Sequence, residues 1–147
     1  MKRLAIPFLA AALVFSGAAH AQFKQDTPRP LGYKKVADAL AGLQKNPDAK
    51  VSHPSGWTVY TIQKPEVAVW SFVPEKHEAY PAVVRRLVRK TDEGTFVEMK
   101  VLCEAKQDAC RRLALHFQQM TQQMQQKLQE MQAQQAQQAQ QAQDAKK

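Results

Sequence analysis

The chain has 147 residues, a net charge of +8 and two cysteines. This length accommodates one domain with short extensions and leaves no room for a second domain of ordinary size. The positive charge favours anionic partners, namely lipid head groups, envelope polysaccharide, nucleic acid or an acidic protein, although it equally serves solubility.

The first 21 residues have the organisation of a secretory signal peptide. A charged start at Lys2 and Arg3 is followed by an apolar stretch over residues 5–15 and by a small-x-small motif that ends at Ala21. We expect cleavage after Ala21 and a periplasmic or secreted mature protein, with an uncleaved N-terminal anchor as the alternative. Cleavage leaves 126 residues with 19 basic and 13 acidic side chains, a net charge of +6. No later apolar segment is long enough to span a bilayer, so we expect no transmembrane segment in the mature chain.

The mature chain begins with a polar segment and a short helix. Residues 22–32 contain two prolines, and we expect them to form a flexible leader. Apolar side chains then recur at helical spacings from Tyr33 to Leu43, which predicts an amphipathic helix over about residues 33–45. Pro47 ends this helix because proline cannot continue the hydrogen-bond pattern.

The middle of the chain has strand character. Branched and aromatic side chains alternate with polar ones, and turn sequences separate the segments. The expected strands are residues 57–63, 67–73, 83–90 and 96–103. In the last of them the apolar residues alternate up to Cys103, so Cys103 is expected to point toward whatever covers the sheet. These features predict an α+β fold: a small antiparallel sheet of about four strands with a short N-terminal helix and a long C-terminal helix.

A long helix without glycine or proline is expected from about residue 105. Its apolar side chains recur at spacings of three and four residues, which is close to the heptad pattern of a coiled coil. We expect this stripe to pack on the sheet up to about residue 120, so that a domain of residues 33–120 precedes a tail of residues 121–147. The stripe consists of Cys110, Leu113, Phe117, Met120, Met124, Leu128 and Met131.

The tail is of low complexity. From Ala133 an Ala-Gln-Gln repeat continues to Gln143, and its period of three drifts around a helix of 3.6 residues per turn. Both residue types favour helix, but the repeat offers no fixed apolar face, so we expect a projecting helix that frays into disorder. The methionine-rich stripe before it is either a seam for self-association or partner binding, or an inert spacer.

The two cysteines predict a disulfide between Cys103 and Cys110. An even pair in an oxidising compartment is typical of a structural bond. Six residues separate the pair, which is not the Cys-x2-Cys spacing of a redox catalyst or a zinc site. The bond would join the last strand to the long helix. Two free thiols or an intermolecular bridge are the alternatives.

The sequence lacks a nucleophile elbow, a phosphate-binding glycine loop and a His-Glu-x-x-His motif. We therefore expect no catalytic residue, no metal and no cofactor. The candidate binding residues are aromatic side chains, a loop histidine and clustered arginines: Trp70, Phe72, His77, Tyr80, Arg85, Arg86, Arg89, Arg111 and Arg112.

Each of these groups has a structural alternative. Aromatic side chains at strand positions are more often core than binding groove. The loop of residues 75–80 places His77 between two carboxylates, a combination that can hold a metal or act as acid and base, yet such loops are usually just solvated. Arg85 and Arg86 are neighbours on a strand and point to opposite faces, which argues against one dense anion site.

The middle of the chain carries three linked motifs: Trp70-Ser71-Phe72-Val73-Pro74, a histidine loop with Tyr-Pro-Ala-Val-Val-x-Arg within residues 77–86, and the strand ending in Cys103 with Cys110 in the next helix. With these motifs, residues 57–117 resemble a group of small secreted proteins of Gram-negative bacteria. The resemblance implies architecture and no established activity. Some members carry a DnaJ-type label, but the His-Pro-Asp motif of that chaperone domain is His53-Pro54-Ser55 here, so the label is not carried over.

We therefore expect a non-enzymatic periplasmic binding or assembly module whose partner is another envelope protein. One alternative is a binder of anionic envelope polymer or nucleic acid that uses the basic surface. The other is a small enzyme or enzyme inhibitor that uses the loop Glu75–Tyr80.

Overall fold

The computed structural model describes residues 29–92 and 94–145. The expected signal peptide, its cleavage site and most of the leader lie outside the described residues. In chain order the elements are α1 (Val36–Gln44), β1 (Lys50–Ser52), a 3-10 turn (Pro54–Gly56), β2 (Thr58–Ile62), β3 (Val67–Phe72), β4 (Ala82–Thr91), β5 (Gly94–Cys103) and α2 (Gln107–Asp144).

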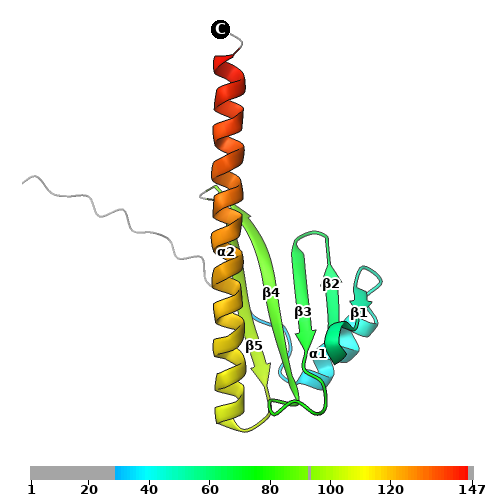
Figure 1. Cartoon of the computed structure of the whole chain (residues 1–147). Coiled ribbons are helices and arrows are strands. Elements are labelled where there is room, and N and C mark those ends of the chain that lie inside the picture. The colour runs from blue at the N-terminus through cyan, green and yellow to red at the C-terminus, as the bar shows by residue number, and fades with distance from the viewer. Residues whose placement is uncertain (1–28, 93, 146–147) are drawn as a thin grey trace, which may run out of the picture.

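The five strands form one antiparallel sheet in the order β1-β2-β3-β4-β5 (Figure 1). The predicted α+β class, the short helix and the long C-terminal helix are confirmed. The sheet has one strand more than expected, because β1 is three exposed residues without an apolar alternation and left no pattern to read. Gly94, the first residue of β5, has a φ of 136°, which a residue without Cβ adopts at little cost.

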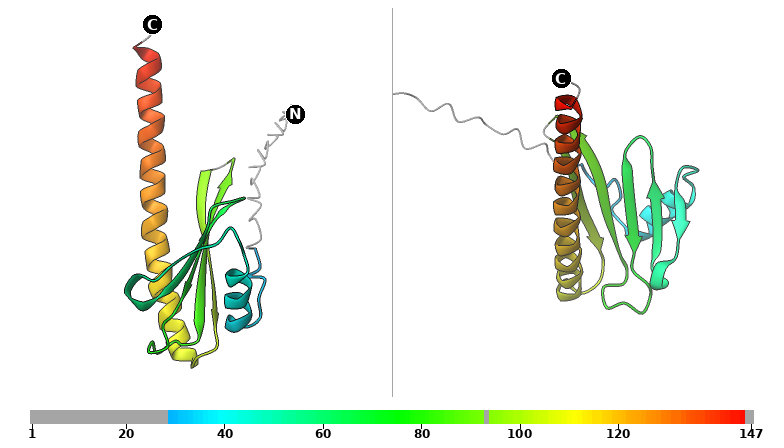
Figure 2. Two further views of the ribbon diagram at one scale, coloured as in Figure 1. Left: turned by 90° about the vertical axis from the view of Figure 1, so that its right-hand side faces the viewer. Right: turned by 45° about the horizontal axis from the view of Figure 1, so that its top comes forward.

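The sheet is the middle layer, with α1 on one side and α2 on the other (Figure 2). Because side chains alternate along a strand, each strand contributes to both sides. The α1 side is built around Trp70, Phe72 and Val83, and the α2 side around Val84, Leu113 and Phe117. The molecule thus has two apolar clusters, one on each face of the sheet.

Two candidate binding residues belong to the α1-side cluster. Trp70 is 6% exposed and Phe72 is 5% exposed. Both side chains are therefore part of the core, and Phe72 also lines a hollow of about 810 Å³. The reason is the register, which turns both rings toward the side that α1 covers.

Helix α2 packs along the sheet for longer than expected. Thr121 is buried, and the side-chain amide of Gln125 donates to the carbonyl of Thr95 at 2.8 Å and accepts from the N–H of Val97 at 2.8 Å. A ten-residue strand is roughly 33 Å long and a helix rises about 1.5 Å per residue, so about 22 helical residues run beside β5. The expected boundary at residue 120 therefore falls inside the packed part of α2.

The stripe that α2 buries also differs from the heptad expectation. Met120 is 37% exposed, and Thr121 is buried in its place, with its hydroxyl donating to the carbonyl of Phe117 at 2.7 Å. Spacings of four from Leu113 onward rotate the contact by about 40° per step. Beyond Glu130 every described helical residue is exposed, and this part of α2 projects past the sheet as a continuous helix to Asp144 (Figure 1).

Candidate functional site

A disulfide joins Cys103 to Cys110, with the two Cα atoms 5.7 Å apart. This distance lies in the ordinary range for such bonds. The predicted pairing is confirmed, and Cys103 contacts the α2-side cluster as expected. The bond ties the end of β5 to the first turn of α2, so it sets where the long helix begins relative to the sheet.

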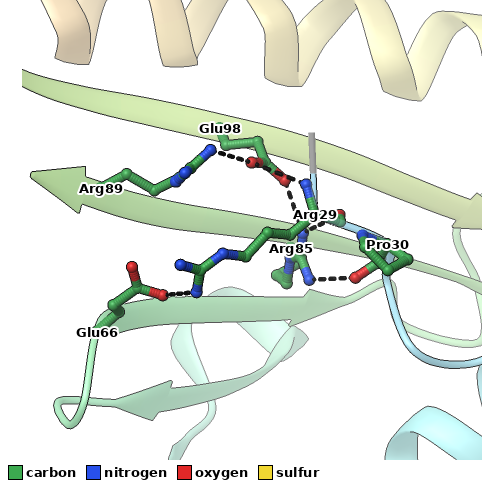
Figure 3. Close-up of polar contacts among 6 residues, drawn as sticks. All are labelled: Arg29, Pro30, Glu66, Arg85, Arg89 and Glu98. Atoms are coloured by element: carbon green, nitrogen blue, oxygen red, sulfur yellow. Dashed lines mark hydrogen bonds and ion pairs between the residues drawn. The ribbon is translucent and has the colours of Figure 1, made fainter. Parts of the chain in front are cut away.

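On the α1 face, Arg85 is the centre of a buried ionic network (Figure 3). Arg85 is 7% exposed. Its guanidinium donates to the carbonyls of Arg29 at 2.8 Å and Pro30 at 2.9 Å, and to Glu98 at 2.8 Å. Arg85 therefore holds the chain together and is not a surface residue for an external anion. The end of the leader, expected to be flexible through residue 32, is fastened here.

Glu98 is the common carboxylate of that network. Besides Arg85 it lies 3.6 Å from Arg89 and accepts from the backbone N–H of Arg29 at 3.2 Å. The side chain of Arg29 in turn pairs with Glu66. Glu98 pairs in register with Leu87, which places it diagonally beside Arg85 and Arg89 of β4. Sequence reasoning missed Glu98, because only the register shows that this outward-looking carboxylate faces two arginines.

On the α2 face, Arg86 has no such carboxylate among residues 29–92 and 94–145. It is half-buried, with its guanidinium carbon 5.6 Å from the ring centre of Phe117. Its Nε atom is buried without a hydrogen-bond partner in the described structure, and this burial lowers the pKa of Arg86. In the described strands, the charged residues in register on the α2 side are all cations: Lys50, Arg86 and Lys90.

Helix α2 leaves about half of this face uncovered. It lies over β4 and β5, while β1, β2 and β3 lie to one side of it in Figure 1 and in the right view of Figure 2. At the border Trp57 contacts the Phe117 ring at 5.6 Å and the His77 ring at 5.5 Å. We call the uncovered region with its border the open α2-side face; it consists of Trp57, Val59, Thr61, Val67, Val69 and Met120.

Hydrogen bonds within the loop of residues 75–80, and from this loop to α2, hold its polar side chains in place. The Nδ1 atom of His77 accepts from the N–H of Ala79 at 3.0 Å. Glu78 receives two hydrogen bonds from Arg112, at 2.9 and 2.6 Å, and these hold the pKa of Glu78 below its usual value. Within residues 29–92 and 94–145, no three His, Cys, Asp or Glu side chains gather as a metal site requires.

Tyr80 separates two hollows at the end of the sheet near the disulfide. It is 46% exposed and lines both hollows, whose volumes are about 700 and 810 Å³. Arg112 and Glu78 flank the smaller hollow, and Arg111 pairs with Asp108 at 2.5 Å. The predicted arginine cluster is thus divided between two sheet faces and the first turns of α2.

Comparison of the chain with protein-family models, with curated proteins and with solved structures finds no match in any of the three. The likeness to small secreted proteins of Gram-negative bacteria stays a prediction. No helix in the described part of the chain has the length and apolarity needed to cross a membrane.

Proposed function

We propose that this protein is a non-enzymatic periplasmic binding module that holds another envelope protein against its open α2-side face. The observation that carries the proposal is the sheet face that α2 covers only over β4 and β5. Val59, Val67 and Val69 share that face with no helix above them. These three valines are only partly buried, and covering their remaining apolar surface with a partner would be favourable.

The open area has the width of one helix. Five strands give four spacings of about 4.8 Å, or roughly 19 Å, and a helix with its side chains is about 10–12 Å across. Since α2 occupies the half over β4 and β5, a second helix fits beside it. A sheet covered by two helices on one face is an ordinary α+β layer arrangement.

The disulfide supports the expected compartment. A bond between Cys103 and Cys110 persists in an oxidising environment such as the periplasm and is rare in the cytosol. The proposal therefore places the partner in the cell envelope.

The alternative of an anionic polymer has weaker support. Arg85 and Arg89 bind Glu98, Arg111 binds Asp108 and Arg112 binds Glu78. The arginines therefore form no continuous basic surface of the kind that follows a polyanion. The enzyme or inhibitor alternative also has weaker support. The Glu78 carboxylate that it would use already pairs with Arg112, and His77 Nδ1 accepts a hydrogen bond from the N–H of Ala79 in its own loop.

The proposal is tested by photo-cross-linking from single positions in the periplasm. Val69, on the open α2-side face, is replaced by p-benzoylphenylalanine. The matched control is Val51, a 52% exposed valine that pairs in register with Tyr60 and so lies on the opposite face. We expect one adduct from position 69 that is absent from position 51. The captured protein is then purified and must bind the unmodified protein. Equal capture from both positions, or none, would overturn the proposal.

A further inference from the structure

Given the partner-binding role proposed above, we propose that the open α2-side face receives an amphipathic helix that carries one carboxylate within its apolar side, and that this carboxylate pairs with Arg86. The partner is thus defined by chemistry: a helix of another protein with a single Asp or Glu among apolar residues.

The two sheet faces differ in whether the arginines of β4 have a carboxylate beside them. On the α1 face the cations of β4 meet Glu98, whose side chain is 12% exposed. On the α2 face Arg86 lies against the Phe117 ring, and no described carboxylate pairs with it. A half-buried guanidinium without an anion is costly, because burial removes hydration that no opposite charge replaces. A partner carboxylate would give Arg86 the opposite charge that Glu98 gives Arg85 on the other face.

Arg86 lies at the border between the covered and the uncovered halves of the α2-side face. It pairs in register with Val69 on β3 and Met99 on β5. Met99 packs against the α2-side cluster, whereas Val69 belongs to the open α2-side face. Arg86 therefore lies on the line between the covered and the uncovered halves, where the inner edge of a second helix would lie.

The surface of the open α2-side face suits a helix better than a small molecule or a second copy of this chain. The hollows of about 700 and 810 Å³ are lined by other residues, near Tyr80, whereas the open α2-side face presents valines on neighbouring strands. A helix with an apolar side suits such a surface. A second copy of this chain suits it less, because each mature copy carries a net charge of +6 and this face contributes only cations.

The test uses three synthetic amphipathic helices of identical apolar face that differ at one central position, which is Glu, Gln or Lys. Binding is followed by Trp57 fluorescence, with Trp70, buried in the other cluster, replaced by Phe. We expect the Glu peptide to bind about tenfold or more tightly than the Gln peptide, because a charge-assisted pair forms in a partly dry site. The Lys peptide should bind most weakly.

Variants at position 86 separate the pair from general charge. In Arg86→Gln the preference for Glu over Gln should vanish, and Arg86→Glu should reverse it toward Lys. Lys90→Gln removes one cation from the same face and should leave the preference intact. Circular dichroism confirms that each variant is folded.

Equal binding of the Glu and Gln peptides, survival of the preference in Arg86→Gln, or no binding at about 1 mM would overturn the inference. So would an oligomer that Arg86→Gln dissociates, since a second copy would then be the occupant. If Val69 captures a partner whose affinity is unchanged by Arg86→Gln, this inference fails while the proposed function stands.

Discussion

Neighbouring arginines on β4 have opposite environments. The terminal nitrogens of Arg85 bind Glu98 and two carbonyls of the leader, while Arg86 lies against Phe117 with no carboxylate from the described residues. The Nε atoms of both arginines are buried without a partner in the described structure. Strand alternation predicts that they point apart. It does not say which face holds an anion, because Glu98 reaches Arg85 only through the pairing of β4 with β5.

Replacing Glu98 by Gln should destabilise the fold. The substitution keeps the shape of the side chain but leaves Arg85 buried without its anion, which costs about 3 kcal/mol. We expect a lower unfolding free energy by urea titration. Glu78→Gln is the matched control, because that carboxylate is exposed and its ion pair adds little. Equal loss in both variants would contradict the buried role of Glu98.

The pKa of Glu78 should depend on Arg112. Hydrogen bonds from Arg112 hold that pKa below its usual value, so the pair contributes stability above the unfolded carboxyl pKa and loses it as the pH falls through the lowered value. In an NMR titration, Arg112→Gln should raise the Glu78 pKa. Arg111→Gln, one residue away and paired with Asp108, should leave it unchanged. An identical Glu78 pKa in both variants would count against the pair.

At the scale of elements, α2 acts as the cover of an edge strand. β5 is the last strand of the sheet, and its outward backbone groups would otherwise invite pairing with another chain. Gln125 occupies two of them, the N–H of Val97 and the carbonyl of Thr95. The glutamines of α2 therefore do not all have the same role. Gln125 makes the two backbone hydrogen bonds that a neighbouring strand would otherwise make with β5.

Gln125→Ala should expose the edge of β5. Two backbone groups lose their partner, at a cost of about 1–3 kcal/mol if water does not replace it. Hydrogen exchange of the Val97 amide should accelerate. Gln126→Ala, at an exposed position of the same helix, should leave that amide protected. Unchanged exchange in Gln125→Ala would show that the hydrogen bond does not protect the edge.

Breaking the bond between Cys103 and Cys110 should weaken the joint of β5 and α2. For so short a loop the entropy model gives about 2–3 kcal/mol, a large share of the stability of a small domain. Cys103→Ser with Cys110→Ser should lower the free energy of unfolding, measured by urea titration, by that amount. The oxidised protein should show no reactive thiol when unfolded, and a titration of two thiols there would contradict the intrachain bond.

For the whole molecule, the sheet separates two clusters of different character. The α1 side is closed by α1 and the fastened end of the leader. The α2 side is closed over β4 and β5 alone. This asymmetry is what makes the open α2-side face the preferred surface for a partner.

Two truncations should distinguish the packed part of α2 from the projecting part. Ending the chain after Gln132 removes residues 133–147, of which the described ones, 133–145, are all exposed, and should leave the thermal midpoint unchanged. Ending it after Met120 removes Thr121, Gln125 and Leu128, which contact or lie against the sheet, and should lower the midpoint by several degrees. Equal midpoints would restore the domain boundary at residue 120.

The sequence by itself determined what local patterns encode: four of the five described strands, the two helices and the pairing of Cys103 with Cys110. These follow from periodicity and spacing, which act between near neighbours. Only the tertiary structure decided that Trp70 and Phe72 are core, that Glu98 neutralises Arg85, and that α2 leaves half of a face open. Those features depend on strand register and on which layer covers each face, and both are set by contacts between residues far apart in the chain.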